Sequence, residues 1–232
     1  NEGLASFDVT DPANAYSFQA GATAIVARRF FIDEPSDPNE AYTLYLAEDW
    51  KGVRIFEEAT SDPGFLDAGV FLETADKAYD VQVRGGYAFV ADDELGLTVL
   101  DVSDPELGDG PVAQLDSPGD AVAIALGEDH AYIAGSQHGL TVIDVSDPLA
   151  PTLSAQLGLG GECVDVVFFD GYALAIVRGL GLCVVDVSDP EAPVLESTLT
   201  CPGGNGLCVD DDGLVVVATD TDLRIFRYEP TL

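Results

Sequence analysis

The sequence lacks methionine altogether and has only two lysines, two histidines and one tryptophan among its 232 residues. Because no initiator methionine is present, we expect a processed chain or a fragment, most simply one that has lost a secretion signal. Two histidines exclude a metal site built on several imidazoles. There is also no Asn-x-Ser/Thr acceptor, no apolar run long enough to span a membrane and no stretch with helical periodicity. These absences argue against helical repeats and membrane-spanning helices.

Basic residues are scarce as well: there are 9, against 42 acidic residues, for a formal net charge of -33. Such a surface repels nucleic acid and anionic membrane, so neither is expected as a partner and no membrane insertion is expected. The charge suits a high-salt or calcium-rich solvent that screens self-repulsion, and an ordinary acidic secreted protein is the alternative. On the first interpretation, the melting temperature should rise from low to molar salt.

Four cysteines, Cys163, Cys183, Cys201 and Cys208, all lie in the last third of the chain. An even number in a small region favours two disulfides in an oxidising compartment, and four reduced thiols are the alternative. The flexible stretch between Cys201 and Cys208 could bring them within bridging distance. Cys163 and Cys183 are expected on segments separated by a third strand, so a crossed pairing between neighbouring repeats also stays open.

What the chain has instead is one repeated stretch, which ends in Asp-Val-Ser-Asp-Pro in its best copies. These run from Gly96 to Pro105, from Gly139 to Pro148 and from Gly181 to Pro190. Weaker copies run from Gly3 to Pro12, from Gly52 to Pro63 and from Asp222 to Pro230. Their prolines stand 51, 42, 43, 42 and 40 residues apart, and a period near 42 with short apolar segments is typical of β-propeller blades.

Each period contains four short segments with strand character, and Gly85-Gly86 and Asp170-Gly171 provide hairpin signals between two of them. Several segments are apolar on nearly every residue, as expected where neighbouring blades cover both faces of a sheet. We therefore predict an all-β fold: a single domain over residues 1–232, a propeller of four-stranded antiparallel blades. Five blades are preferred to six, with the ring closed by a terminal strand.

Two local features add detail to this predicted fold: the repeated turn and an insertion in the first period. In the repeated turn, Ser and Asp side chains can bond nearby amides and proline stops the ladder, so Asp104-Pro105, Asp147-Pro148 and Asp189-Pro190 read as strand stops rather than metal ligands. The first period is longer, and its excess is assigned to an exposed acidic insertion at residues 28–40. This insertion is a candidate contact surface or a tolerated loop without a role.

The units resemble the LVIVD-repeat family of bacterial and archaeal surface proteins. The resemblance rests on Gly-Leu-Thr-Val-Ile-Asp-Val-Ser-Asp-Pro and on Tyr-Ala-Phe-Val-Ala at residues 87–91, and it is strongest from Ala78 to Val194. It implies a β-propeller outside the cell or on its surface, and it implies no particular reaction.

Candidate catalytic residues are few. Asp80 and Asp165 occupy equivalent positions on expected innermost strands and could face the central channel together. Some propellers use paired carboxylates to hydrolyse sugars. The repeat equivalence of Asp80 and Asp165 favours a structural role instead. The acidic run Asp210–Asp212 lacks EF-hand spacing and reads as a hairpin tip rather than a calcium site, and Trp50 is a ligand platform or a blade-edge residue. No nucleophile elbow or phosphate loop is present, so we expect no catalytic residues, no metal and no cofactor.

Counting segments leaves one strand too many for five blades of four. If Ser17 to Ala20 completes the last blade, Leu4 to Val9 is surplus; otherwise Leu223 to Tyr228 is left over. A free apolar strand is an edge-pairing hazard, and adding it to a neighbouring subunit would cover it and could build a filament. An extra fifth strand or a surface arm is the alternative. The expected assembly strand comprises Leu4, Ala5, Ser6, Phe7, Asp8 and Val9.

Three functions follow from this reading. The preferred one is a non-enzymatic extracellular or cell-surface structural protein that self-associates. The second is a binding module for a glycan or a peptide, with the loops on one propeller face as the site. The third, least favoured, is a hydrolase that uses Asp80 and Asp165.

Overall fold

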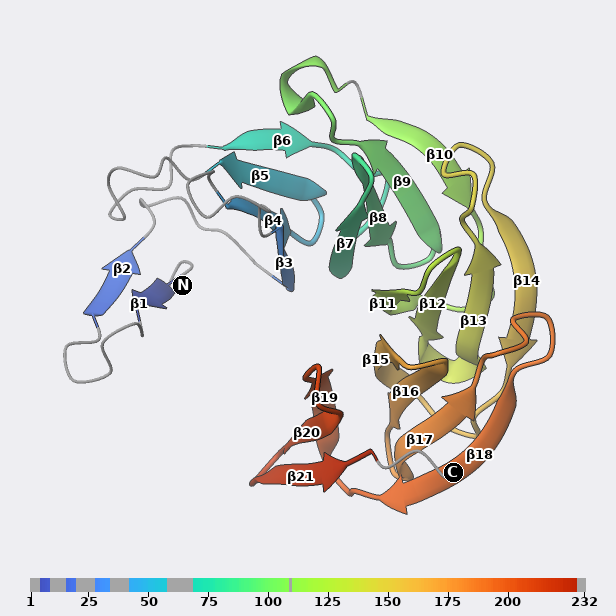
Figure 1. Ribbon diagram of the computed structural model, residues 1–232. Helices are drawn as coiled ribbons and strands as arrows, with labels where there is room; N and C mark the ends of the chain where they lie inside the picture. The colour runs from blue at the N-terminus through green and yellow to red at the C-terminus, as the bar shows by residue number, and fades with distance from the viewer. Residues whose placement is uncertain are drawn as a thin grey trace.

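The computed structural model describes residues 5–8, 16–19, 28–33, 42–57, 69–108 and 110–228. Its sheets are antiparallel throughout, and five of them are arranged around one axis as propeller blades (Figure 1). This confirms the predicted all-β propeller and its five blades. The first four blades have four strands each, and the fifth has three. Among the described residues, no helix is long and apolar enough to cross a membrane.

The blade strands follow the chain from the axis outwards. They are β3 (Phe30–Asp33), β4 (Thr43–Ala47), β5 (Val53–Glu57) and β6 (Val70–Leu72); β7 (Asp80–Arg84), β8 (Tyr87–Ala91), β9 (Leu97–Asp101) and β10 (Pro111–Leu115); β11 (Ala121–Leu126), β12 (His130–Gly135), β13 (Gly139–Asp144) and β14 (Thr152–Leu157); β15 (Cys163–Phe169), β16 (Tyr172–Val177), β17 (Gly181–Asp186) and β18 (Val194–Thr200); β19 (Gly204–Val209), β20 (Leu214–Thr219) and β21 (Leu223–Arg227). Two short 3-10 helices, η1 (Pro105–Leu107) and η2 (Ser136–His138), lie in connections.

The repeated turn ends strands as the sequence predicted. Strands β9, β13 and β17 stop at the first aspartate of the motif, and the Asp144 carboxylate accepts bonds from the Ser146 amide at 2.9 Å and hydroxyl at 2.6 Å. The Asp101 carboxylate holds Ser103 in the same way. These bonds lower the pKa of both aspartates, with the serine hydroxyl as the largest cause. The predicted hairpins are confirmed too: Gly85 and Gly86 both adopt positive φ between β7 and β8.

The hydrophobic core lies between blades rather than inside one layer. Four buried clusters fill the contacts between blades one and two, two and three, three and four, and four and five. This explains why β13 is apolar on both faces: Leu140 and Val142 pack toward the fourth blade, while Ile143 packs toward the second. In the described part of the chain, no such cluster joins the fifth blade to the first.

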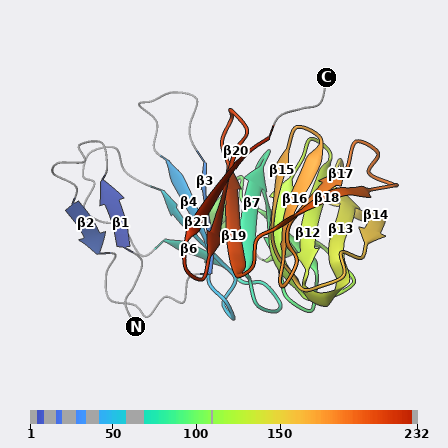
Figure 2. The same ribbon diagram turned by 90° about the horizontal axis from the view of Figure 1, so that it is seen from below.

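The predicted closure by a terminal strand is not what the structure shows. Strand β1 (Ala5–Asp8) pairs with β2 (Tyr16–Gln19) in a separate two-stranded sheet, and β21 is the last strand of its blade. The two strands of this sheet are neighbours in the sequence, so their pairing closes only a short loop, which costs little entropy. The ring therefore has an open side between the first and fifth blades, and the β1–β2 hairpin lies at that side (Figures 1 and 2).

The predicted insertion at residues 28–40 was drawn too wide. Phe30–Asp33 form β3, the innermost strand of the first blade, and Arg28 and Arg29 already bond to Ala47 of β4. Residues 34–40 lie outside the described residues, so any contact role for them stays a prediction.

Candidate functional site

The first candidate site lies on the axis, where each blade contributes the same register position of its innermost strand. Cross-strand partners identify these positions as Asp80 opposite Ala91, Ala123 opposite Ala134, Asp165 opposite Ile176 and Gly206 opposite Ala218. In the first blade the position belongs to Arg29. The amide of the preceding residue, Arg28, donates to the carbonyl of Ala47, just as the amide of Tyr79, which precedes Asp80, donates to the carbonyl of Ala91. Around the axis, the five equivalent residues are Arg29, Asp80, Ala123, Asp165 and Gly206.

Both channel aspartates bind the next blade with the same pattern. Asp80 accepts the amide of Val81 at 2.9 Å and that of Ile124, on the next innermost strand, at 3.0 Å. Asp165 likewise accepts the amide of Val166 at 2.9 Å and that of Leu207, on the next blade, at 2.7 Å. Each carboxylate therefore joins two innermost strands of adjacent blades.

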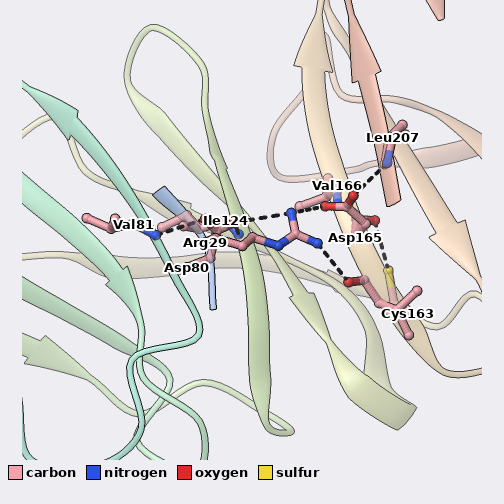
Figure 3. Close-up of polar contacts among 9 residues, drawn as sticks. Arg29, Asp80, Val81, Ile124, Cys163, Asp165, Val166 and Leu207 are labelled. Atoms are coloured by element: carbon pink, nitrogen blue, oxygen red, sulfur yellow. Dashed lines mark hydrogen bonds and ion pairs between the residues drawn. The ribbon is translucent and has the colours of Figure 1, made fainter. Parts of the chain in front are cut away.

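Arg29 lies between these two carboxylates and reaches across the axis (Figure 3). Its guanidinium donates a short hydrogen bond to Asp165 Oδ1, and its Nη1 lies 3.6 Å from Asp80 Oδ2. Its second nitrogen, Nη2, lies 3.4 Å from the carbonyl oxygen of Val164. The first blade is thus tied to the second and to the fourth by one side chain.

Burial governs the electrostatics of this group. Asp80 is 3% exposed, and burial raises its pKa to about 7, while Arg29 and the Ile124 amide lower it and Asp165 raises it further. Burial acts to lower the pKa of Arg29, but attraction to Asp165 and Asp80 outweighs it, and the net shift is upward. The cation therefore stays charged and compensates the two buried carboxyls.

The sequence pointed to Asp80 and Asp165 but missed Arg29. The structure confirms that the two aspartates take equivalent places on innermost strands and come together around one partner. Arg29 was assigned to the insertion because the first period departs from the repeat spacing. Ala47 is the signal that could have identified it. Ala47 is the counterpart of Ala91, and their partners on the innermost strands are Arg29 and Asp80.

The predicted disulfides are absent: all four cysteines are free thiols. Cys201 is buried against the fourth blade, whereas Cys208 pairs with Val216 on the opposite face of the fifth blade and is exposed, so the two cannot meet. Cys163 and Cys183 share one buried cluster across the intervening strand β16. Burial raises the pKa of Cys163 to about 12, with further increases from Cys183 and Asp165.

Other residues that the sequence singled out lie apart from the axis. Trp50 is 71% exposed, and the ammonium of Lys77 lies 4.4 Å from its ring centroid. Asp210 accepts the amides of Asp212 and Leu214, as expected of a hairpin tip. In the described residues, no group of three or more His, Cys, Asp or Glu side chains gathers in a way that could hold a metal.

The second candidate site is the open fifth blade. Among the described residues, strand β21 pairs only with β20. Two hydrogen bonds fix its orientation: Thr219 N donates to Asp222 O, and Tyr228 N donates to Gly213 O. Because bonding alternates along an antiparallel pair, the amides of Leu223 and Ile225 point away from β20, toward the free edge. Their side chains are 69% and 64% exposed.

The predicted assembly strand, Leu4 to Val9, includes β1, which pairs with β2 and so does not stand alone. Leu4 and Val9 themselves lie outside the described residues. The described residues therefore include two strands outside the blades, β1 and β2, and one blade without a fourth strand.

Comparison with solved structures supports the fold. The chain matches the computationally designed Ika8 protein with a TM-score of 0.61 and 10% identity, covering 85% of this chain and 57% of that one. It matches a chain of the Mitotic Checkpoint Complex with a TM-score of 0.66 and 8% identity, covering 81% of this chain and 61% of that one. The chain spans less than two thirds of either structure, and these likenesses concern the fold alone.

Comparison with curated proteins found no match. Comparison with family models found the LVIVD repeat at residues 75–106, 118–157 and 160–200, which correspond to the second, third and fourth blades. These three blades are the ones that contain the full Asp-Val-Ser-Asp-Pro turn. The chain belongs to the LVIVD repeat family.

Proposed function

We propose that this propeller is a non-enzymatic structural protein of the cell surface or the extracellular space, which assembles with copies of itself by strand addition. The observation that carries the proposal is the unpaired edge of β21. Within the described part of the chain, nothing bonds its outward amides at Leu223 and Ile225, and both side chains are exposed. An exposed, apolar edge strand is a template for another strand.

The axial group supports a structural role over catalysis. A glycosidase needs one carboxyl to give a proton and a second to act on the sugar. Here both carboxylates accept two backbone amides each, and the Arg29 guanidinium lies between them. The raised pKa of Asp80 follows first from burial, and burial also suits a group that holds blades together.

The acidic surface sets the condition for assembly. At a net charge of -33, copies repel one another in dilute salt, and screening shortens the range of this repulsion. We therefore expect association to strengthen from low to molar salt.

The test is the mass of the full chain by size-exclusion chromatography with light scattering, over a range of concentration and salt, with electron microscopy of the largest species. Ile225→Pro removes an outward amide without breaking a bond to β20, so it should leave a folded monomer. Ile225→Ala keeps the amide and should still assemble. An intact chain that is monomeric in every condition, or a proline variant that assembles as well as the intact chain, would overturn the proposal.

A further inference from the structure

Over the described residues, the fifth blade has no fourth strand, and the space where that strand would lie is bounded on two sides. On one side is the free edge of β21. On the other is β18, which is exposed at all seven residues, although its counterpart β14 in the third blade has intermediate burial at half of its positions. Between them lies a cavity of about 230 Å³, lined by Tyr172, Leu174, Leu182, Val184, Glu196, Ser197, Leu199, Val215, Phe226, Arg227 and Tyr228.

Complete blades show what belongs in this space. In the third blade, Leu157, Gln156 and Ala155 of β14 pair with Leu140, Thr141 and Val142. In the second blade, Leu115, Gln114 and Ala113 of β10 pair with Leu97, Thr98 and Val99. Both fourth strands thus carry Ala-Gln-Leu at the same register, and their Ala and Leu side chains pack against the next blade.

The segment around β2 has the features of such a fourth strand. It follows Asp11-Pro12 as β14 follows Asp147-Pro148, and its Phe18-Gln19-Ala20 aligns with Ala155-Gln156-Leu157 around the shared glutamine. The pairing of β21 with β20 matches that of β13 with β12, so Leu223 and Ile225 are the counterparts of Leu140 and Val142. A fourth strand in the same register as β14 would place Ala20 opposite Leu223, Gln19 opposite Arg224 and Phe18 opposite Ile225.

The bulge that β14 and β18 share extends the match by one more residue. In the third blade, Ile143 pairs with Leu153 beyond the bulge, on the face toward the preceding blade. In a completed fifth blade, the corresponding pair would be Phe226 with Tyr16. This register position lies on the cavity side, since Phe226 lines the cavity. A cavity with aromatic and aliphatic walls suits the ring of a tyrosine, whose hydroxyl can stay near polar groups at the rim.

We infer that the strand which completes the fifth blade is Tyr16–Ala20 of a second copy of this chain. The inference rests on the proposed function and names its donor. Within its own chain, β2 is held by β1 at the open side of the ring, apart from β21 (Figures 1 and 2). With the blades placed as they are, adding a chain's own β2 would pair the edge but leave Leu223 and Ile225 uncovered.

A second copy can both pair the edge of β21 and cover its exposed apolar side chains. Its strand pairs the edge, and its body can cover the apolar side chains that the open ring leaves exposed on both sides: Phe30, Ile32, Leu223 and Ile225. The donor segment carries no charged residue between Ala13 and Ala27, so it adds no carboxylate to the interface. One donor and one acceptor per chain make a head-to-tail contact, which need not close on itself.

Cysteine cross-linking tests the register and the donor together. Arg224 and Gln19 are predicted to form a non-hydrogen-bonded pair, whose Cα atoms lie about 4.5 Å apart, within reach of a disulfide. Gln19→Cys with Arg224→Cys, in a Cys208→Ser background, should form covalent dimers and longer ladders on oxidation in molar salt. Gln19→Cys with Arg227→Cys, three residues out of register, is the matched control and should not cross-link efficiently.

Each outcome separates the inference from the function that it rests on. A cross-linked monomer without dimers would overturn the second copy as donor, and equal or absent cross-linking in both pairs would overturn the register. If the cross-link fails in one of these ways, while the intact chain still assembles and Ile225→Pro abolishes assembly, the proposed function stands and only the inference fails. Deletion of residues 1–10 supplies an independent check, because it keeps β2 and frees it from β1: assembly should persist, and its loss would make Leu4 to Val9 the donor instead.

Discussion

The third and fifth blades are copies of one repeat unit, yet equivalent positions in them are buried to very different degrees. Leu140 and Val142 of β13 are fully buried, whereas their counterparts in β21, Leu223 and Ile225, are 69% and 64% exposed. The third blade has a fourth strand on its edge and a neighbour on each face. The fifth has neither a fourth strand nor a following blade among the described residues. The repeat thus specifies strands and turns, while burial depends on what is placed next to them.

The largest expected effect comes from changing one equivalent position in both blades. Leu140→Ala leaves a cavity in the cluster between the third and fourth blades and should lower the free energy of unfolding by about 2–5 kcal/mol. Leu223→Ala removes an exposed side chain and should change it by less than about 0.5 kcal/mol in the monomer. Urea denaturation at low protein concentration measures both. Equal losses would mean that the fifth blade is covered in solution, contrary to the open ring.

Two neighbouring arginines of the first blade give the next contrast. Arg29→Ala leaves the buried carboxylates of Asp80 and Asp165 without their cation, and should lower the free energy of unfolding by about 3 kcal/mol. Arg28→Ala breaks an exposed ion pair with Asp49 and should cost less than about 1 kcal/mol. Denaturant midpoints of the two variants, measured side by side, give the difference. A mild effect of Arg29→Ala would show that the axis does not hold the first blade in place.

Two aspartates should give opposite dependences on pH. Asp80 has its pKa raised from 3.8 to about 7, so between these values the folded chain holds a proton that the unfolded chain has released, and the free energy of unfolding falls as pH rises. Asp80→Asn should flatten this decline. Asp101 has its pKa lowered, so its contribution is present above 3.8 and is lost as pH falls, and Asp101→Asn should remove that loss.

Denaturation at several pH values between 3.8 and 7 measures the Asp80 slope, and denaturation at pH values below 3.8 measures the Asp101 slope. An Asp80→Asn variant with an unchanged slope would contradict the assigned cause.

The smallest effect is expected at the repeated turn. Ser146→Ala removes the hydroxyl that bonds Asp144 but keeps the amide bond, and should lower the free energy of unfolding by about 1 kcal/mol. Ser154→Ala, outside this turn in β14, is the control. If the two variants have the same free energy of unfolding, the hydrogen bond of the Ser146 hydroxyl does not stabilise the turn.

The sequence predicted those features that depend on local chemistry and on the repeat. The strand stop at Asp144, the Gly85-Gly86 hairpin and the placement of Asp80 and Asp165 follow from residues that recur at fixed spacing. Arg29 escaped because its importance arises from contacts with two other blades, more than fifty and more than one hundred residues away. The disulfide prediction was wrong because closeness in sequence does not set the direction of a side chain: Cys201 follows β18 and is buried between the fourth and fifth blades, whereas Cys208 lies on the exposed face of β19.

The partner of β2 could not be predicted either, because the same segment suits both the local hairpin with β1 and the vacant edge of β21. Sequence pattern identifies a fourth strand but does not select which edge it joins. That choice depends on concentration and on the energies of the competing pairings.

The central claim is that the fifth blade is incomplete in the single chain and completed by a second one. Amide hydrogen exchange of β21, followed against protein concentration with β13 as the internal reference, tests it most directly. We predict that the amides of Leu223 and Ile225 exchange fast in dilute protein and become protected as the chain assembles, while those of Leu140 and Val142 stay protected throughout. Protection of Leu223 and Ile225 at the lowest concentration, or fast exchange at every concentration, would contradict it.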